Sequence, residues 1–98
     1  MIGIQGIGVY IPSLRNSNFD RMEQFEMSEG FVREKIGFTS LSQKAPDVET
    51  SDLCLKAWND IRSRHTISLE AVDCLVVCTQ NPDDQGLPHT SAIVHQKL

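Results

Sequence analysis

The sequence has no apolar run long enough to cross a membrane. Its longest uninterrupted apolar stretch, residues 74–78, is far shorter than the roughly 20 residues that a membrane-spanning helix needs. The N-terminus also lacks the basic start and the long apolar segment of a secretory signal peptide. We therefore expect a protein of the cytoplasm that has no membrane partner.

An excess of basic residues is also lacking. Nine Lys and Arg stand against 13 Asp and Glu, and the resulting net charge of -4 weakens any general attraction to nucleic acid. Five basic residues lie between positions 15 and 44, but five acidic residues are interleaved with them. This mixture indicates a solvated surface, so we expect no nucleic-acid partner.

Cysteines spaced for pairing or for metal binding are missing as well. The 3 cysteines include no C-x-x-C pair, and their odd number argues against a disulfide framework. Cys74 and Cys78 lie in a strand-like run, where about 13 Å would separate them, too far for two ligands of one metal ion. His89 and His95 would face different sides of a helix. No metal site is expected.

The glycines near the N-terminus do not form a dinucleotide-binding fingerprint. The stretch GIQGIGVYIP has the order G-x-x-G-x-G, whereas the fingerprint is G-x-G-x-x-G and follows a strand. Residues 9–11 followed by Pro12 favour a strand, which places the glycines inside it. The apolar face changes phase near Gln5–Gly6, which indicates either a bulge or a very close backbone neighbour.

Two short helices are predicted in the next part of the chain. Asn18 suits the N-cap of a helix that runs to about Phe25. Ser28 suits the N-cap of a second helix, which ends where Gly37 would adopt a left-handed conformation. A short strand is expected at 39–41.

The strongest helical pattern covers residues 51–64. Apolar side chains recur there at three- and four-residue spacing, and the N-terminal end is acidic. Ser68 is expected to cap a single helical turn at 69–72. A last helix is predicted to begin at His89–Thr90.

The apolar run within residues 72–79 predicts a strand that is buried on both faces. Such strands are typical of the centre of a parallel sheet in α/β proteins, and the polar loop 79–88 lies at the carboxyl end, where such sheets bind ligands. A central strand needs neighbours, yet 98 residues form one small domain at most and contain only two or three short strands. We therefore expect these residues to be the N-terminal portion of a larger fold.

From Ile4 to Leu98, the sequence resembles the N-terminal part of β-ketoacyl-acyl carrier protein synthase III and its thiolase-fold relatives. The matching residues, in chain order, are Gly6, Gly8, Tyr10, Pro12, Asn18, Asp20, 28–32, 35–37, 49–53, 75–79, Leu87–Pro88 and 96–98. The resemblance implies an α/β fold with a mixed, mostly parallel sheet covered by helices. It also implies that residues 1–98 are an incomplete N-terminal half of a thiolase-like domain.

The resemblance implies an acyltransferase of fatty acid biosynthesis. Such a condensing enzyme takes an acyl group from acyl-coenzyme A onto a cysteine and joins it to a malonyl group on acyl carrier protein. Coenzyme A thioester is then a substrate, and no resident cofactor is implied. The family's cysteine comes beyond the point that matches Leu98, with its histidine and asparagine partners further on. We therefore expect no catalytic residue here and no turnover by this chain alone.

Cys78 is the alternative nucleophile that the sequence itself offers. It ends the apolar run at a position that the family fills with a small residue, and no basic side chain near it in sequence would lower its pKa. We interpret Cys78, like Cys54 and Cys74, as a small core residue.

Three residues are candidates for the site. In the family, a tryptophan and an arginine four residues later hold the adenine end of coenzyme A, and Phe31 and Lys35 occupy the matching positions. Phe31 is either a stacking surface or a core anchor, and Lys35 either a ligand contact or a solvated charge. Leu87 matches a residue that closes the acyl pocket of a partner subunit, or it is a local anchor. Asn81, Asp83 and Asp84 are interpreted as turn and cap residues.

Two alternatives to a condensing enzyme of fatty acid biosynthesis remain. One is a non-catalytic half-fold that associates with itself or binds another chain, and the other is a related condensing enzyme of secondary metabolism. In either case an uncovered apolar strand edge invites pairing, so we expect a homo-oligomer.

Overall fold

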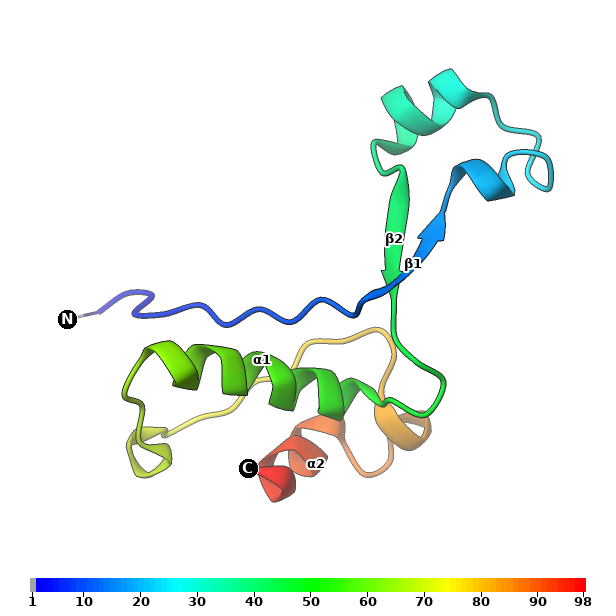
Figure 1. Ribbon diagram of the computed structural model, residues 1–98. Coiled ribbons are helices and arrows are strands. Elements are labelled where there is room, and N and C mark those ends of the chain that lie inside the picture. The colour runs from blue at the N-terminus through cyan, green and yellow to red at the C-terminus, as the bar shows by residue number, and fades with distance from the viewer. Residues whose placement is uncertain (1) are drawn as a thin grey trace. The chain divides into compact units, whose positions relative to one another are not determined.

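A computed structural model describes residues 2–98, which form two compact units (Figure 1). Residues 11–45 form one unit, and residues 2–10 together with 46–98 form the other. We call them the hairpin unit and the helical unit. Among residues 2–98, no helix has both the length and the apolarity that crossing a membrane requires.

The hairpin unit is built on two short antiparallel strands, β1 (Leu14–Ser17) and β2 (Ser40–Gln43) (Figure 1). The strand expected at 39–41 is thus confirmed, beginning one residue later and ending two residues later than predicted, whereas its partner β1 was not predicted. Beyond the last pair, the Asn18 N–H donates to the carbonyl of Thr39 at 2.8 Å, and Asn18 Nδ2 donates to the carbonyl of Phe38 at 2.7 Å. Asn18 is buried, and its side chain closes the end of the hairpin.

The helix predicted from Asn18 to Phe25 is wrong. Only a single 3-10 turn forms, Phe19–Arg21, followed by irregular turns. The physical reason is that the Asn18 side chain bonds across to Phe38 and does not cap the turn that follows it.

The second predicted helix exists as a short π-helix, Phe31–Ile36. Ser28 Oγ accepts the Phe31 N–H at 3.1 Å, as expected of a cap, and Gly37 is left-handed with φ 77°. The Gly37 N–H donates to the carbonyl of Val32 at 3.0 Å, which closes the wide turn. Val32 is fully buried and anchors this helix.

The helical unit contains the predicted long helix as α1 (Thr50–Arg64) and the predicted last helix as α2 (Thr90–Lys97). The two helices pack against each other (Figure 1). Glu49, not Thr50 or Ser51, is the N-cap of α1, and its backbone N–H donates to Asp52 Oδ2 at 2.9 Å. A single 3-10 turn forms at Leu69–Ala71, close to the predicted turn after Ser68, and Asp83–Gly86 forms a tight turn with non-helical residues inside it.

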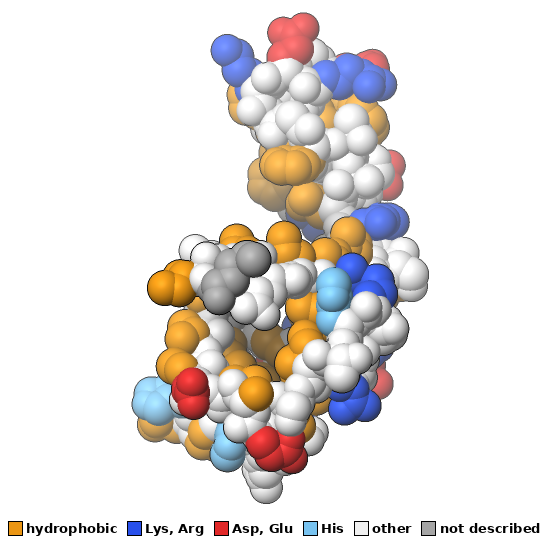
Figure 2. Space-filling model, turned by 90° about the vertical axis from the view of Figure 1, so that its left-hand side faces the viewer, with side chains coloured by type: hydrophobic (Ala, Val, Ile, Leu, Met, Phe, Trp, Pro, Cys, Tyr) orange, Lys and Arg blue, Asp and Glu red, His pale blue; other side chains and the backbone are white. Residues whose placement is uncertain are grey.

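The expectation of a doubly buried strand at 72–79 is wrong for this chain. No strand is assigned there or at 2–12, because neither segment forms a backbone ladder with another segment of residues 2–98. The Val76 side chain is 81 % exposed, and Cys74 and Cys78 are also exposed. A hollow of about 340 Å³ opens between this segment, Gly8 and the two helices, and Figure 2 shows it bordered by apolar side chains.

Segment 6–9 lies directly against α1. A Cβ on Gly8 would come within 2.2 Å of the Ala57 carbonyl oxygen, and one on Gly6 within 2.9 Å of Ile61. The very close backbone neighbour that was one of the two explanations for the change of apolar phase is thus found at Gly8, whereas Gly6 lies against the Ile61 side chain.

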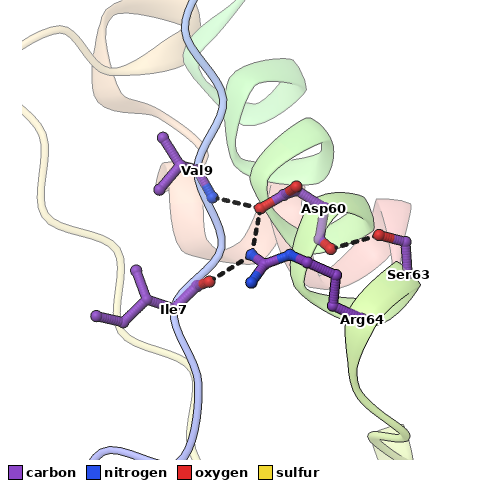
Figure 3. Close-up of polar contacts among 5 residues, drawn as sticks. All are labelled: Ile7, Val9, Asp60, Ser63 and Arg64. Carbon is purple, nitrogen blue, oxygen red and sulfur yellow. Dashed lines mark hydrogen bonds and ion pairs between the residues drawn. The ribbon is translucent and has the colours of Figure 1, made fainter.

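Side chains of α1 bind the backbone of the same segment (Figure 3). The Val9 N–H donates to Asp60 Oδ2 at 2.9 Å, and Arg64 donates to the Ile7 carbonyl at 2.7 Å and to Asp60 Oδ2 at 2.6 Å. These bonds, first that from Val9 and then that from Arg64, lower the pKa of the Asp60 carboxyl. The side chains of Asp60 and Arg64 thus form hydrogen bonds with the backbone of segment 6–9 of the kind that a neighbouring strand would form.

Candidate functional site

Phe31 lies at the start of the π-helix and is 46 % exposed. Beside it is an open hollow of about 480 Å³ that Phe25, Glu26, Met27 and Ser28 also line. The ring therefore borders a space into which a flat ligand could stack.

The two cations of this helix differ in what they contact. Arg33 Nε lies 2.9 Å from Glu29 Oε1, and the Arg33 guanidinium lies 4.9 Å from the centre of the Phe19 ring. Lys35 is exposed, and no ion pair to it is found among residues 2–98. Lys35 is thus the helix cation whose charge is not already matched within the hairpin unit.

Leu87 lies in the helical unit, whereas Phe31 and Lys35 lie in the hairpin unit. Leu87 is 77 % exposed and follows the tight turn Asp83–Gly86. The only backbone bond of the Leu87 N–H within the described chain is a long one, 3.5 Å, to the Asp84 carbonyl.

Asp83 is the buried polar residue that holds the loop in front of Leu87. Its Oδ1 accepts the Ser51 N–H at 3.0 Å, and its own N–H donates to Thr90 Oγ1 at 3.1 Å. Its predicted role as a cap residue is confirmed, but it caps the distant N-terminus of α1. Thr50 Oγ1 adds a second tie by donating to the Asn81 carbonyl at 2.6 Å.

Lys97 joins the two helices at the same end of α1. Its Nζ donates to Ser51 Oγ at 2.7 Å and to Asp52 Oδ1 at 2.9 Å. The bond to Lys97 is the main cause that lowers the pKa of Asp52, and the same bond raises the pKa of Lys97. Sequence reasoning missed these bonds because Lys97 lies 46 positions from Ser51 and 45 from Asp52.

The cysteines differ from the expectation of three core residues. Cys54 is half-buried on α1, and burial, followed by the charge of Asp83, raises the pKa of its thiol. Cys74 and Cys78 are exposed, so their interpretation as core residues is wrong for this chain. Within residues 2–98, no group of three His, Cys, Asp or Glu side chains is placed to hold a metal ion.

No family model matches the sequence. A protein named beta-ketoacyl-[acyl-carrier-protein] synthase III 2 from Halalkalibacterium halodurans is 30% identical over 95 residues, which are 97% of this chain and 28% of that protein. A beta-ketoacyl-[acyl-carrier-protein] synthase III from Bacillus pumilus is 29% identical over 96 residues, or 98% of this chain and 30% of that protein.

The fold matches as well. The crystal structure of beta-ketoacyl-[acyl-carrier-protein] synthase III from Thermus thermophilus superposes with a TM-score of 0.83 at 33% identity, over 98% of this chain and 30% of that one. The chain thus spans less than a third of the length of these relatives. The expected α/β class is confirmed, and over nearly its whole length the chain is similar in sequence and fold to the N-terminal part of beta-ketoacyl-[acyl-carrier-protein] synthase III.

Proposed function

We propose that these residues form the N-terminal part of a cytoplasmic acyltransferase that condenses an acyl group from acyl-coenzyme A with malonyl-acyl carrier protein in fatty acid biosynthesis. The observation that carries the proposal is the likeness in sequence and fold over 97% to 98% of the chain. The relatives are named as synthases of beta-ketoacyl-acyl carrier protein.

In this proposal the π-helix binds the nucleotide end of coenzyme A. The exposed face of Phe31 stacks on the adenine, and the Lys35 ammonium lies near the phosphates as a point charge. Lysine cannot form the two parallel hydrogen bonds of an arginine, so we expect weaker recognition of phosphate than a guanidinium would give.

In the helical unit, Leu87 closes the acyl pocket of a second copy of the chain. Its exposed apolar side chain in a polar loop supports this role. Cys54 is not an activated nucleophile, because burial raises the pKa of its thiol and thiolates are the reactive form. We therefore expect no turnover of acyl-coenzyme A by the 98-residue chain alone.

Titration of coenzyme A into the natural full-length protein tests the nucleotide site. Replacing Phe31 by alanine removes one stacking contact and is expected to weaken binding roughly tenfold. The matched control is Phe38→Ala, because Phe38 is an exposed phenylalanine of the same unit that does not line the hollow. Equal affinity of wild type and the Phe31 variant would assign Phe31 to packing alone.

A second candidate function is a non-catalytic half-fold that associates with itself. The exposure of Val76 and its apolar neighbours supports it, because an uncovered apolar segment favours pairing. Sedimentation of the 98-residue chain at micromolar concentration tests it: oligomers are expected, and a monodisperse monomer would contradict self-association.

A further inference from the structure

The loop before Leu87 contains three consecutive left-handed residues. Asp84 has φ 46° and ψ 38°, Gln85 has φ 61° and ψ 20°, and Gly86 has φ 93°. The first two carry a Cβ, so this conformation is unfavourable for them and persists only where surrounding contacts impose it.

The contacts that impose it converge on Asp83, which directly precedes this left-handed run. Only 2 % of Asp83 is exposed, and the residue is tied at both its side chain and its backbone N–H. Through Ser51 it is fixed to the first turn of α1, and through Thr90 to the first turn of α2. Two packed helices therefore define where the left-handed run begins.

Leu87 comes directly after this run and has little support of its own. Its side chain is largely exposed, and its backbone N–H bonds only within the loop, to Asp84, among residues 2–98. The position of the Leu87 side chain thus depends on the conformation of residues 84–86, which in turn depends on Asp83.

We propose that Asp83 is a positioning residue that places Leu87 and thereby sets which acyl chain lengths the enzyme accepts. This inference rests on the proposed function, in which Leu87 borders an acyl pocket. Without the Asp83 carboxylate, the Ser51 N–H loses its acceptor and the left-handed run loses its fixed start. Leu87 then samples several positions, and the pocket no longer discriminates between acyl chains by length.

The experiment uses the natural full-length protein and measures kcat/KM with acetyl-coenzyme A and hexanoyl-coenzyme A. The readout is the ratio of the two values, because a merely structural defect lowers both together. We expect Leu87→Ala to change the ratio about tenfold, the effect of altering an apolar pocket wall. Asp83→Ala is expected to change it in the same direction by at least about fivefold, and Asp83→Asn by less than about twofold, because the amide oxygen still accepts the Ser51 N–H.

Thr90→Val is a second variant that tests the positioning role of Asp83 if Asp83→Ala does not fold. It removes only the acceptor of the Asp83 N–H, so a change of about two- to threefold in the same direction is expected. A wild-type ratio in Asp83→Ala or Thr90→Val, together with a changed ratio in Leu87→Ala, overturns the positioning role and leaves the proposed function intact. A wild-type ratio in Leu87→Ala overturns both the inference and the pocket role of Leu87.

Discussion

The two units of the molecule differ in which groups form hydrogen bonds with their extended backbone segments. In the hairpin unit, β1 and β2 bond to each other, so backbone groups meet backbone groups. In the helical unit, no strand among residues 2–98 pairs with segment 6–9, and Asp60 and Arg64 of α1 bind its backbone. The hairpin is therefore a local structure, whereas segment 6–9 depends on side chains more than 50 residues away in the sequence.

The largest loss of stability is expected from a substitution at Gly8, where segment 6–9 packs against α1. A Cβ there would lie 2.2 Å from the Ala57 carbonyl oxygen, so Gly8→Ala is expected to destabilise the helical unit by about 3 kcal/mol. Chemical denaturation followed by the fluorescence of Trp58 on α1 measures this cost. Gly30→Ala is the matched control, because nothing lies within 4 Å of its added Cβ, and an unchanged or slightly higher stability is expected. Equal stability of the two variants would contradict the close packing.

A smaller effect is expected at the closed end of the hairpin. Asn18→Ala removes the bond from the buried Asn18 side chain to the Phe38 carbonyl and is expected to cost about 1 kcal/mol. Hydrogen exchange of the amides of β1 and β2 measures the loss. Asn16→Ala is the control, because the Asn16 side chain bonds only to exposed Gln43, and faster exchange in that variant than in Asn18→Ala would contradict the account.

Acid is expected to release segment 6–9 from α1. The pKa of Asp60 is lowered in the folded state, so its stabilising contribution is complete above the unfolded value of about 3.9 and disappears as the pH falls through the folded value. The chemical shift of the Val9 amide measured against pH reports this titration. We expect the midpoint of this titration below about pH 3.9, and no such change of the Val9 shift in Asp60→Asn. A midpoint at or above that value would contradict a stabilising bond between Asp60 and Val9.

The smallest effect is expected for the exposed pair on the π-helix. Glu29→Gln removes the partner of Arg33, and pairs of this kind contribute about 0.3–0.5 kcal/mol. The measurement is the stability of the hairpin unit at low and at high salt, with a difference between wild type and variant only at low salt. A difference that persists at high salt would show that the pair does more than attract by charge.

The sequence was sufficient for structure that depends on neighbours along the chain. The apolar spacing of residues 51–64 predicted α1, and Ser28 and Gly37 marked the two ends of the second helix, because caps act within a few residues. β1 was missed because its residues, LRNS, include only one that favours burial.

Contacts between distant residues could not be predicted. The bond between Asp83 and Ser51 spans 32 positions, and only Pro82 and the polar loop around Asp83 suggested a turn there. The burial of 72–79 was overestimated because apolar composition shows that a segment can be covered, not that residues 2–98 supply the covering strands. For the site, the sequence identified Phe31, Lys35 and Leu87 by resemblance, and their roles stay predictions.

The central claim is that these residues belong to an acyl-coenzyme A-dependent condensing enzyme, and a condensation assay tests it most directly. The natural full-length protein is mixed with acyl-coenzyme A and malonyl-acyl carrier protein, and the β-ketoacyl-acyl carrier protein formed is measured by mass spectrometry. The account predicts a product two carbons longer than the acyl group supplied, with release of coenzyme A. Folded full-length protein that forms no such product from any acyl-coenzyme A would contradict it.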